Sequence, residues 1–210
     1  MDRFAFAHAS GSDWKSIAEQ CLAELNGPEQ RVGQARLGFL YLTDHLASDT
    51  GDILAFLRER TGVRDWVGSV GMGICATGRE YFGEPALAVM ISELPENSYR
   101  LLEGIDNPDA LSKEVAGWAD SRESCFGIVH ADPRNGVIPD IIAELADQLN
   151  GFLVGGLTSS HGALSQVSGD VCDGGVSGVM LGENVAVITA LSQSCMPIGL
   201  RHQITACVEN

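Results

Sequence analysis

The sequence predicts an α/β protein with mixed sheets and flanking helices, built from two duplicated strand-helix-strand-strand halves. The main observation is that one element occurs twice. Residues 152–162 begin as a short apolar run that breaks into glycines, hydroxyl side chains and a histidine, and residues 66–73 have the same order of aromatic, aliphatic and small residues. Short apolar runs bounded by glycine are typical of buried strands that end in a turn. A strand-helix pattern precedes each of them.

The chain begins with a short alternating strand at residues 4–9, which precedes the first half. A helix follows, in which Trp14 to Leu25 carry apolar side chains at helical spacing, and Asn26 to Pro28 end it. Further strands are predicted at residues 36–42, 66–70 and 85–91, with a helix over 51–60 and a polar hairpin around Thr77 and Gly78.

The second half repeats this order. Residues 125–129 are predicted as a strand, residues 132–136 as a turn and residues 138–149 as an amphipathic helix. Residues 174–181 and 185–191 read as a hairpin turning at 182–184, and residues 203–208 as one more strand. Residues 93–122 are acidic and are expected to be a connector with one or two short helices.

The spacing of the two halves is consistent with duplication. Phe39 and Phe126 lie 87 positions apart, as do Val67 and Val154, whereas the helix stops Gly62 and Gly151 lie 89 apart because the second helix is longer. A period near 90 is too long for a solenoid repeat. We therefore expect a single domain over residues 1–210, with halves at about 35–92 and 123–192.

Composition limits the possible partners and compartment. The formal net charge of −15 disfavours nucleic acid and anionic membrane surfaces. Apolar runs stay shorter than the ~18 residues of a membrane helix, and the N-terminus does not resemble a signal peptide, so a cytoplasmic location is expected. The six cysteines form no C-x-x-C pair, which argues against zinc-knuckle and thioredoxin-type sites.

Three segments resemble the N-terminal half of the FIST domain, a family of intracellular sensory and signal-transduction proteins. They are residues 67–71, residues 154–159 and residues 194–199, the last followed by Thr205 and Asn210, and the resemblance covers roughly residues 35–210. It implies a domain that binds a small molecule, such as an amino acid or a derivative, and signals to a histidine kinase or diguanylate cyclase. It also implies a C-terminal FIST half, and one branch of the family is similar to haem-based nitric oxide sensors.

The predicted ligand site is the seam where the two glycine-rich strand ends converge, because glycines let a ligand approach exposed N–H groups. The loop around Cys195 is expected to form one wall. No catalytic residue, cofactor or metal is predicted. The expected ligand-binding residues are Gly68, Ser69, Gly71, Gly155, Gly156, Thr158, Ser159, His161, Cys195 and Pro197.

Alternative functions are also open. Cys195 has Arg201 and His202 nearby in sequence, so a hydrolase or transferase with Cys195 as nucleophile is one alternative, its base being His202, His161 or His130. A haem-based nitric oxide sensor with His161 as iron ligand is another. A third is an interaction module with a vestigial pocket.

Other motifs have simpler interpretations. Gly71 and Gly73 lack the spacing and the following helix of a dinucleotide fingerprint. Asp44, Asp132 and Asp170 lie near strand ends and are interpreted as turn-forming residues.

Overall fold

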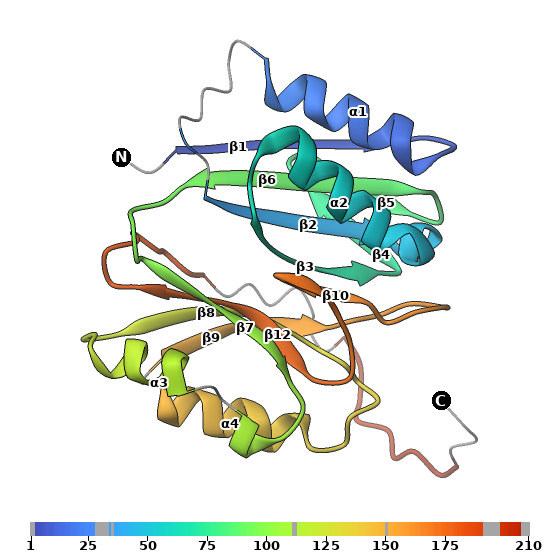
Figure 1. Cartoon of the computed structure of the whole chain (residues 1–210). Coiled ribbons are helices and arrows are strands. Elements are labelled where there is room, and N and C mark those ends of the chain that lie inside the picture. Colours follow the sequence, from blue (N-terminus) through green and yellow to red (C-terminus); the bar gives the residue numbers. More distant parts are fainter. Residues whose placement is uncertain are drawn as a thin grey trace.

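The computed structural model describes residues 3–27, 34, 36–110, 113–149, 151–190 and 198–206. Two β-sheets lie face to face, and helices cover the outer side of each sheet (Figure 1). The predicted α/β class with mixed sheets is confirmed.

The first sheet has six strands in the order β1-β6-β2-β3-β10-β11. Strands β2 and β3 are parallel and the other neighbours are antiparallel. Helices α1 (Trp14–Leu25) and α2 (Thr50–Thr61) cover its outer face. The strands are β1 (Arg3–Ser10), β2 (Leu37–Thr43), β3 (Asp65–Gly71), β6 (Ala86–Glu93), β10 (Gln166–Ser168) and β11 (Asp170–Cys172).

The second sheet has four strands in the order β7-β12-β8-β9, in which β8 and β9 are parallel. Helices α3 (Lys113–Asp120) and α4 (Ile138–Gln148) cover it. Its strands are β7 (Tyr99–Ile105), β8 (Cys125–Ala131), β9 (Gly151–Leu157) and β12 (Val176–Gly182). A separate hairpin, β4 (Gly73–Ala76) and β5 (Arg79–Phe82), lies beside the first sheet, and the short helices η1 (Asp44–Asp49) and η2 (Pro108–Ala110) complete the elements.

Strands β1-β6-β2-β3 and β7-β12-β8-β9 have the same order and the same relative directions in the two sheets. The register corrects the alignment expected from sequence. Val67 pairs with Phe39, but Val154 pairs with Ile128, which is 89 positions after Phe39, rather than with Phe126. The shared topology is what a duplication would produce. The duplication itself stays a prediction.

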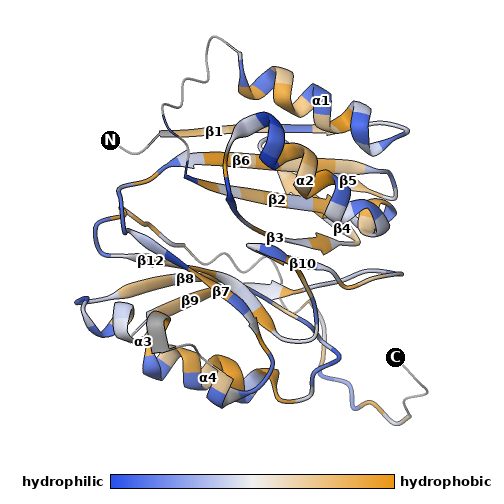
Figure 2. Ribbon diagram, in the orientation of Figure 1, coloured by the Kyte–Doolittle hydropathy of each residue, from blue (hydrophilic) through white to orange (hydrophobic). Residues whose placement is uncertain are grey.

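The alternation of side chains along β2 explains the layers. Leu40 and Leu42 pack under the helices, whereas Leu37 and Phe39 enter a third cluster between the two sheets. Figure 2 shows apolar residues along β2 and β6 and mixed apolar and polar residues along α1 and α4. The cluster between the sheets consists of Leu37, Phe39, Val67, Leu94, Val179, Leu181 and Val185.

The prediction of a hairpin after residue 181 is wrong in its second strand. Residues 186–190 have no regular structure, because β12 is already paired with β7 on one edge and with β8 on the other. Residues 203–206 of the last predicted strand are also irregular, and residues 191 and 207–208 lie outside the described part.

Three strands were not predicted. Strand β7 lies in the segment expected to be a connector, where η2 and α3 match the expected short helices, and β10 and β11 lie in a segment left without a predicted element. Among the helices of the described residues, none is long and apolar enough to cross a membrane.

Candidate functional site

The two glycine-rich strand ends lie on either side of one cavity. It has a volume of about 380 Å³, and we call it the seam cavity because β3 and β4 form one side and β8 and β9 the other. Its lining residues are Tyr41, Ser69, Val70, Gly71, Gly73, Ile74, Cys75, Ile128, His130, Gly155, Gly156, Leu157 and Ser159.

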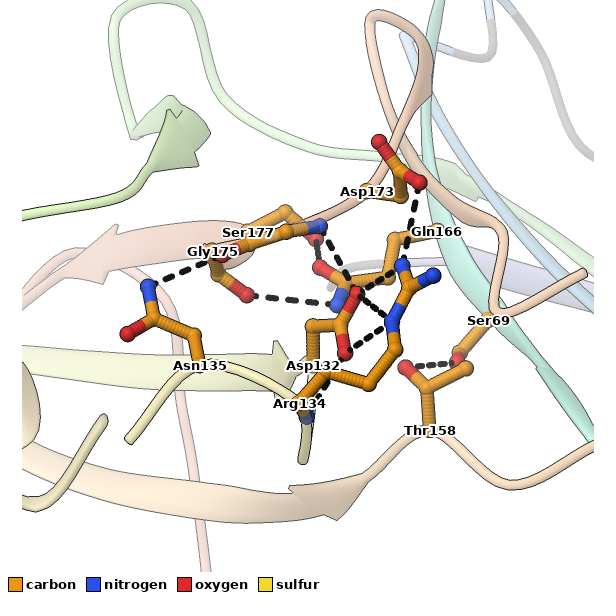
Figure 3. Close-up of polar contacts among 10 residues, drawn as sticks. Ser69, Asp132, Arg134, Asn135, Thr158, Gln166, Asp173, Gly175 and Ser177 are labelled. Atoms are coloured by element: carbon orange, nitrogen blue, oxygen red, sulfur yellow. Dashed lines mark hydrogen bonds and ion pairs between the residues drawn. The ribbon is translucent and has the colours of Figure 1, made fainter. Parts of the chain in front are cut away.

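Two hydrogen bonds join the halves beside the seam cavity. The hydroxyl groups of Ser69 and Thr158 lie 2.9 Å apart (Figure 3), and the backbone N–H of Met72 donates to Ser159 Oγ at 3.1 Å. The Ser69–Thr158 pair is buried. These contacts link the end of β3 to the end of β9.

Tyr41 and His130 meet across the seam. The Tyr41 hydroxyl lies 3.0 Å from His130 Nε2, and the rings pack edge to face with centroids 5.4 Å apart. Burial raises the pKa of Tyr41 to about 12 and lowers the pKa of His130 to about 4, so both side chains are neutral near pH 7. His130 is 6% exposed, and its Nδ1 is buried without a hydrogen-bond partner among the described residues.

Glycine is required at corresponding places in β3 and β9. A methyl group on Gly68 would overlap the carbonyl oxygen of Leu40 in β2, and one on Gly155 would overlap that of Val129 in β8. A methyl group on Gly156 would meet only open space. The first two glycines therefore serve the pairing of parallel strands, and Gly156 leaves room in the cavity.

The structure places the ten predicted residues in different settings. Thr158 is buried against Ser69, and Gly68 pairs with Leu40 inside the first sheet. His161 lies outside the seam cavity, and Cys195 and Pro197 lie outside the described residues. Of the ten predicted residues, five line the cavity: Ser69, Gly71, Gly155, Gly156 and Ser159.

His161 is held by the carboxylate of Asp44. Asp44 Oδ2 accepts from the His161 backbone N–H at 2.9 Å and lies 2.6 Å from Nδ1. Burial raises the pKa of Asp44, but the hydrogen bonds from His161 outweigh it, so the pKa is lowered overall. The His161 side chain is 77% exposed and does not line the seam cavity, so the haem alternative stays a prediction.

Asp132 anchors the turn that follows β8. Its carboxylate accepts from the backbone N–H groups of Arg134 and Gly174, both at 2.9 Å, and is paired with the Arg134 guanidinium, which also reaches Asp173 (Figure 3). The hydrogen bonds from Arg134 lower the pKa of Asp132 to about 2, against the opposing effect of burial. This network ties the end of β8 to the start of β12 and is structural.

Replacing Asp132 with Asn should lower the free energy of unfolding at pH 7 by about 2 kcal/mol, because the buried carboxylate loses its charge-assisted bonds. The folded-state pKa lies below the unfolded value, so this stabilisation is present above pH ~4 and is lost as the pH falls toward 2. Urea unfolding of both proteins at pH 7 and pH 2.5 measures it. An equal difference at both pH values would contradict the assignment.

Sequence reasoning missed Tyr41 and Cys75 as residues of this site and considered His130 only as a possible base for Cys195. Tyr41 and His130 lie 89 positions apart, the same separation as the helix stops Gly62 and Gly151. A spacing of 89, applied to the strands of the two halves, would have predicted that Tyr41 and His130 occupy corresponding positions. Cys75 is exposed and lies in the β4–β5 hairpin, which was expected only as a polar turn.

A comparison with family models matches residues 36–210, most of the chain, to the FIST N domain. Strand β1 and helix α1 precede the matched range, although β1 pairs with β6 along its full length. No curated protein was found that matches the chain.

Proposed function

Since the chain belongs to the FIST N domain family, a family of sensory signal-transduction domains, we propose that it senses a small polar ligand in the seam cavity. The observation that carries this proposal is that both glycine-rich strand ends line one cavity together with Tyr41 and His130. Its volume of about 380 Å³ is within the range of small-molecule pockets, roughly 300 to 1,000 Å³.

The chemistry of the lining favours a ligand whose buried part is uncharged. Among the described residues, those that line the cavity carry no carboxylate, ammonium or guanidinium group, and the low pKa of His130 keeps its ring neutral. Burying an unpaired charge in such a place costs several kcal/mol. Hydroxyl groups of Ser69 and Ser159 support hydrogen bonds to an amide, alcohol or amino-acid derivative.

Signalling would follow from the position of the cavity between the two sheets. A ligand that favours one arrangement of the strand ends shifts the population of that arrangement. The Ser69–Thr158 and Met72–Ser159 bonds are the contacts that such a shift would change. We propose that a cytoplasmic partner, such as a C-terminal FIST half, a histidine kinase or a diguanylate cyclase, reads the change.

A thermal-shift screen with amino acids, their amides and nucleotides tests the proposal. A ligand at 100 times its dissociation constant should stabilise the protein by about 2.7 kcal/mol. Gly156→Leu places a side chain in the open space of the cavity and should abolish the shift, whereas Gly117→Leu, on α3 with similar open space, should leave it intact.

Two results would contradict this proposal. One is the absence of a shift with every compound class. The other is a shift that Gly156→Leu leaves unchanged, which would move the ligand away from the seam cavity. Circular dichroism of both variants shows whether the fold is retained.

A further inference from the structure

The outer edge of β9 differs from that of β3, its counterpart in the first sheet. Strand β3 is paired on both edges, with β2 on one side and β10 on the other. Strand β9 ends its sheet, and in the part of the chain that the structure describes no strand pairs with its second edge. Along this edge Phe152 is 61% and Leu157 62% exposed. An exposed edge of this kind is a template for a further strand.

In the first sheet, strand β10 covers the corresponding edge of β3. Strand β10 lies antiparallel to β3, with Gln166, Val167 and Ser168 opposite Ser69, Gly68 and Val67. Val167 is fully buried in the core cluster under the helices of the first sheet. Its neighbours turn toward the second sheet, where Gln166 bonds to Ser177 and Ser168 donates to the Gly178 carbonyl. The three residues of the covering strand β10 are thus polar, branched apolar and polar in turn.

No described residue fills the corresponding spaces beside β9. Gly155 matches Gly68 in its close approach to the parallel neighbour, and an apolar cavity of about 290 Å³ lies on its helix-facing side. On the opposite side of β9, Gly156 faces the seam cavity. The apolar cavity is lined by Val129, Ala131, Ile142, Leu153, Val154, Gly155, Gly156 and Leu157.

We propose that the outer edge of β9 binds an extended peptide segment of a partner protein as an added antiparallel strand. The central residue of that segment is a branched apolar one that enters the apolar cavity, as Val167 enters the core beside Gly68. The residues on either side are polar and point toward the seam cavity. Backbone hydrogen bonds to the edge supply affinity and the alternating pockets supply specificity. This site adjoins the seam cavity and shares Gly155, Gly156 and Leu157 with it, but the proposal does not depend on small-molecule binding.

A peptide with the sequence of β10 can test this proposal. A fluorescein-labelled peptide of residues 163–171, which contains the β10 sequence, is titrated with the whole protein and followed by fluorescence anisotropy. Saturable binding is expected. A peptide with Asp in place of Val167 should bind at least about tenfold more weakly, since a carboxylate cannot enter an apolar cavity unpaired.

Matched variants locate the binding. Leu157→Asp should weaken binding of the peptide at least about tenfold, because Leu157 lines the apolar cavity. Phe82→Asp, at a side chain of similar exposure (74%) on β5, should not. Amide NMR spectra should place the perturbed signals at residues 154–157.

Several outcomes would overturn the proposal: absence of saturable binding, equal binding by Leu157→Asp, or perturbed signals confined to β3. Light scattering that shows a dimer lost in Leu157→Asp would assign the edge to a second copy and would also overturn it. None of these outcomes overturns the small-molecule proposal, which the thermal-shift screen tests separately.

Discussion

Gly68→Ala should lower the free energy of unfolding by more than about 3 kcal/mol, the largest effect expected of a single methyl group in this protein. The added Cβ would overlap the Leu40 carbonyl oxygen, and the nearest atoms are all backbone. Strand β3 cannot move away, because β2 holds it on one edge and β10 on the other. Urea unfolding followed by circular dichroism measures the change.

Two further glycines provide matched controls. Gly155→Ala creates the same overlap with Val129, but β9 is an edge strand and can shift outward, so its cost should be clearly smaller. Gly156→Ala meets open space and should change the stability by no more than about 0.5 kcal/mol. Equal losses at Gly68 and Gly156 would show that strand propensity, and not the contact with β2, determines the effect.

The elements that the sequence predicted well have a strong local signal. Helices α1 and α4 follow the spacing of their apolar residues, and β2 is a continuous apolar run because both of its faces are covered. Strand β7 was missed since Arg100 and Glu103 interrupt its apolar pattern at the edge of the sheet. Strand β10 has three residues, too few for any periodicity, and is a strand only through pairing with β3 and β11.

Residues 185–190 show the opposite error. Their branched apolar composition predicts a hairpin strand beside β12, but both edges of β12 are already paired with other strands. The candidate site was likewise predicted only in part. The glycine pattern indicated both walls of the seam cavity. The contact between Tyr41 and His130 depends on how the two sheets pack, and no local sequence motif predicts that packing.

Acidification should destabilise the protein through His130. Burial lowers its folded-state pKa from 6.5 to about 4, so the unfolded chain binds more protons between these values. The stabilisation from the neutral ring is complete above pH 6.5 and is lost as the pH falls toward 4. The free energy of unfolding should therefore decrease by about 3 kcal/mol over this interval from His130 alone.

His130→Gln tests this assignment, because glutamine keeps a polar side chain beside Tyr41 but does not titrate. Urea unfolding between pH 4 and pH 7 should show a shallower pH dependence for His130→Gln than for the unmodified protein. His202→Gln, at an exposed histidine, should retain the original dependence. The interval lies above the one assigned to Asp132, so the two groups can be separated in one series. An unchanged slope in His130→Gln, or an NMR titration midpoint near 6.5 for the ring, would contradict burial of a neutral His130 at the seam.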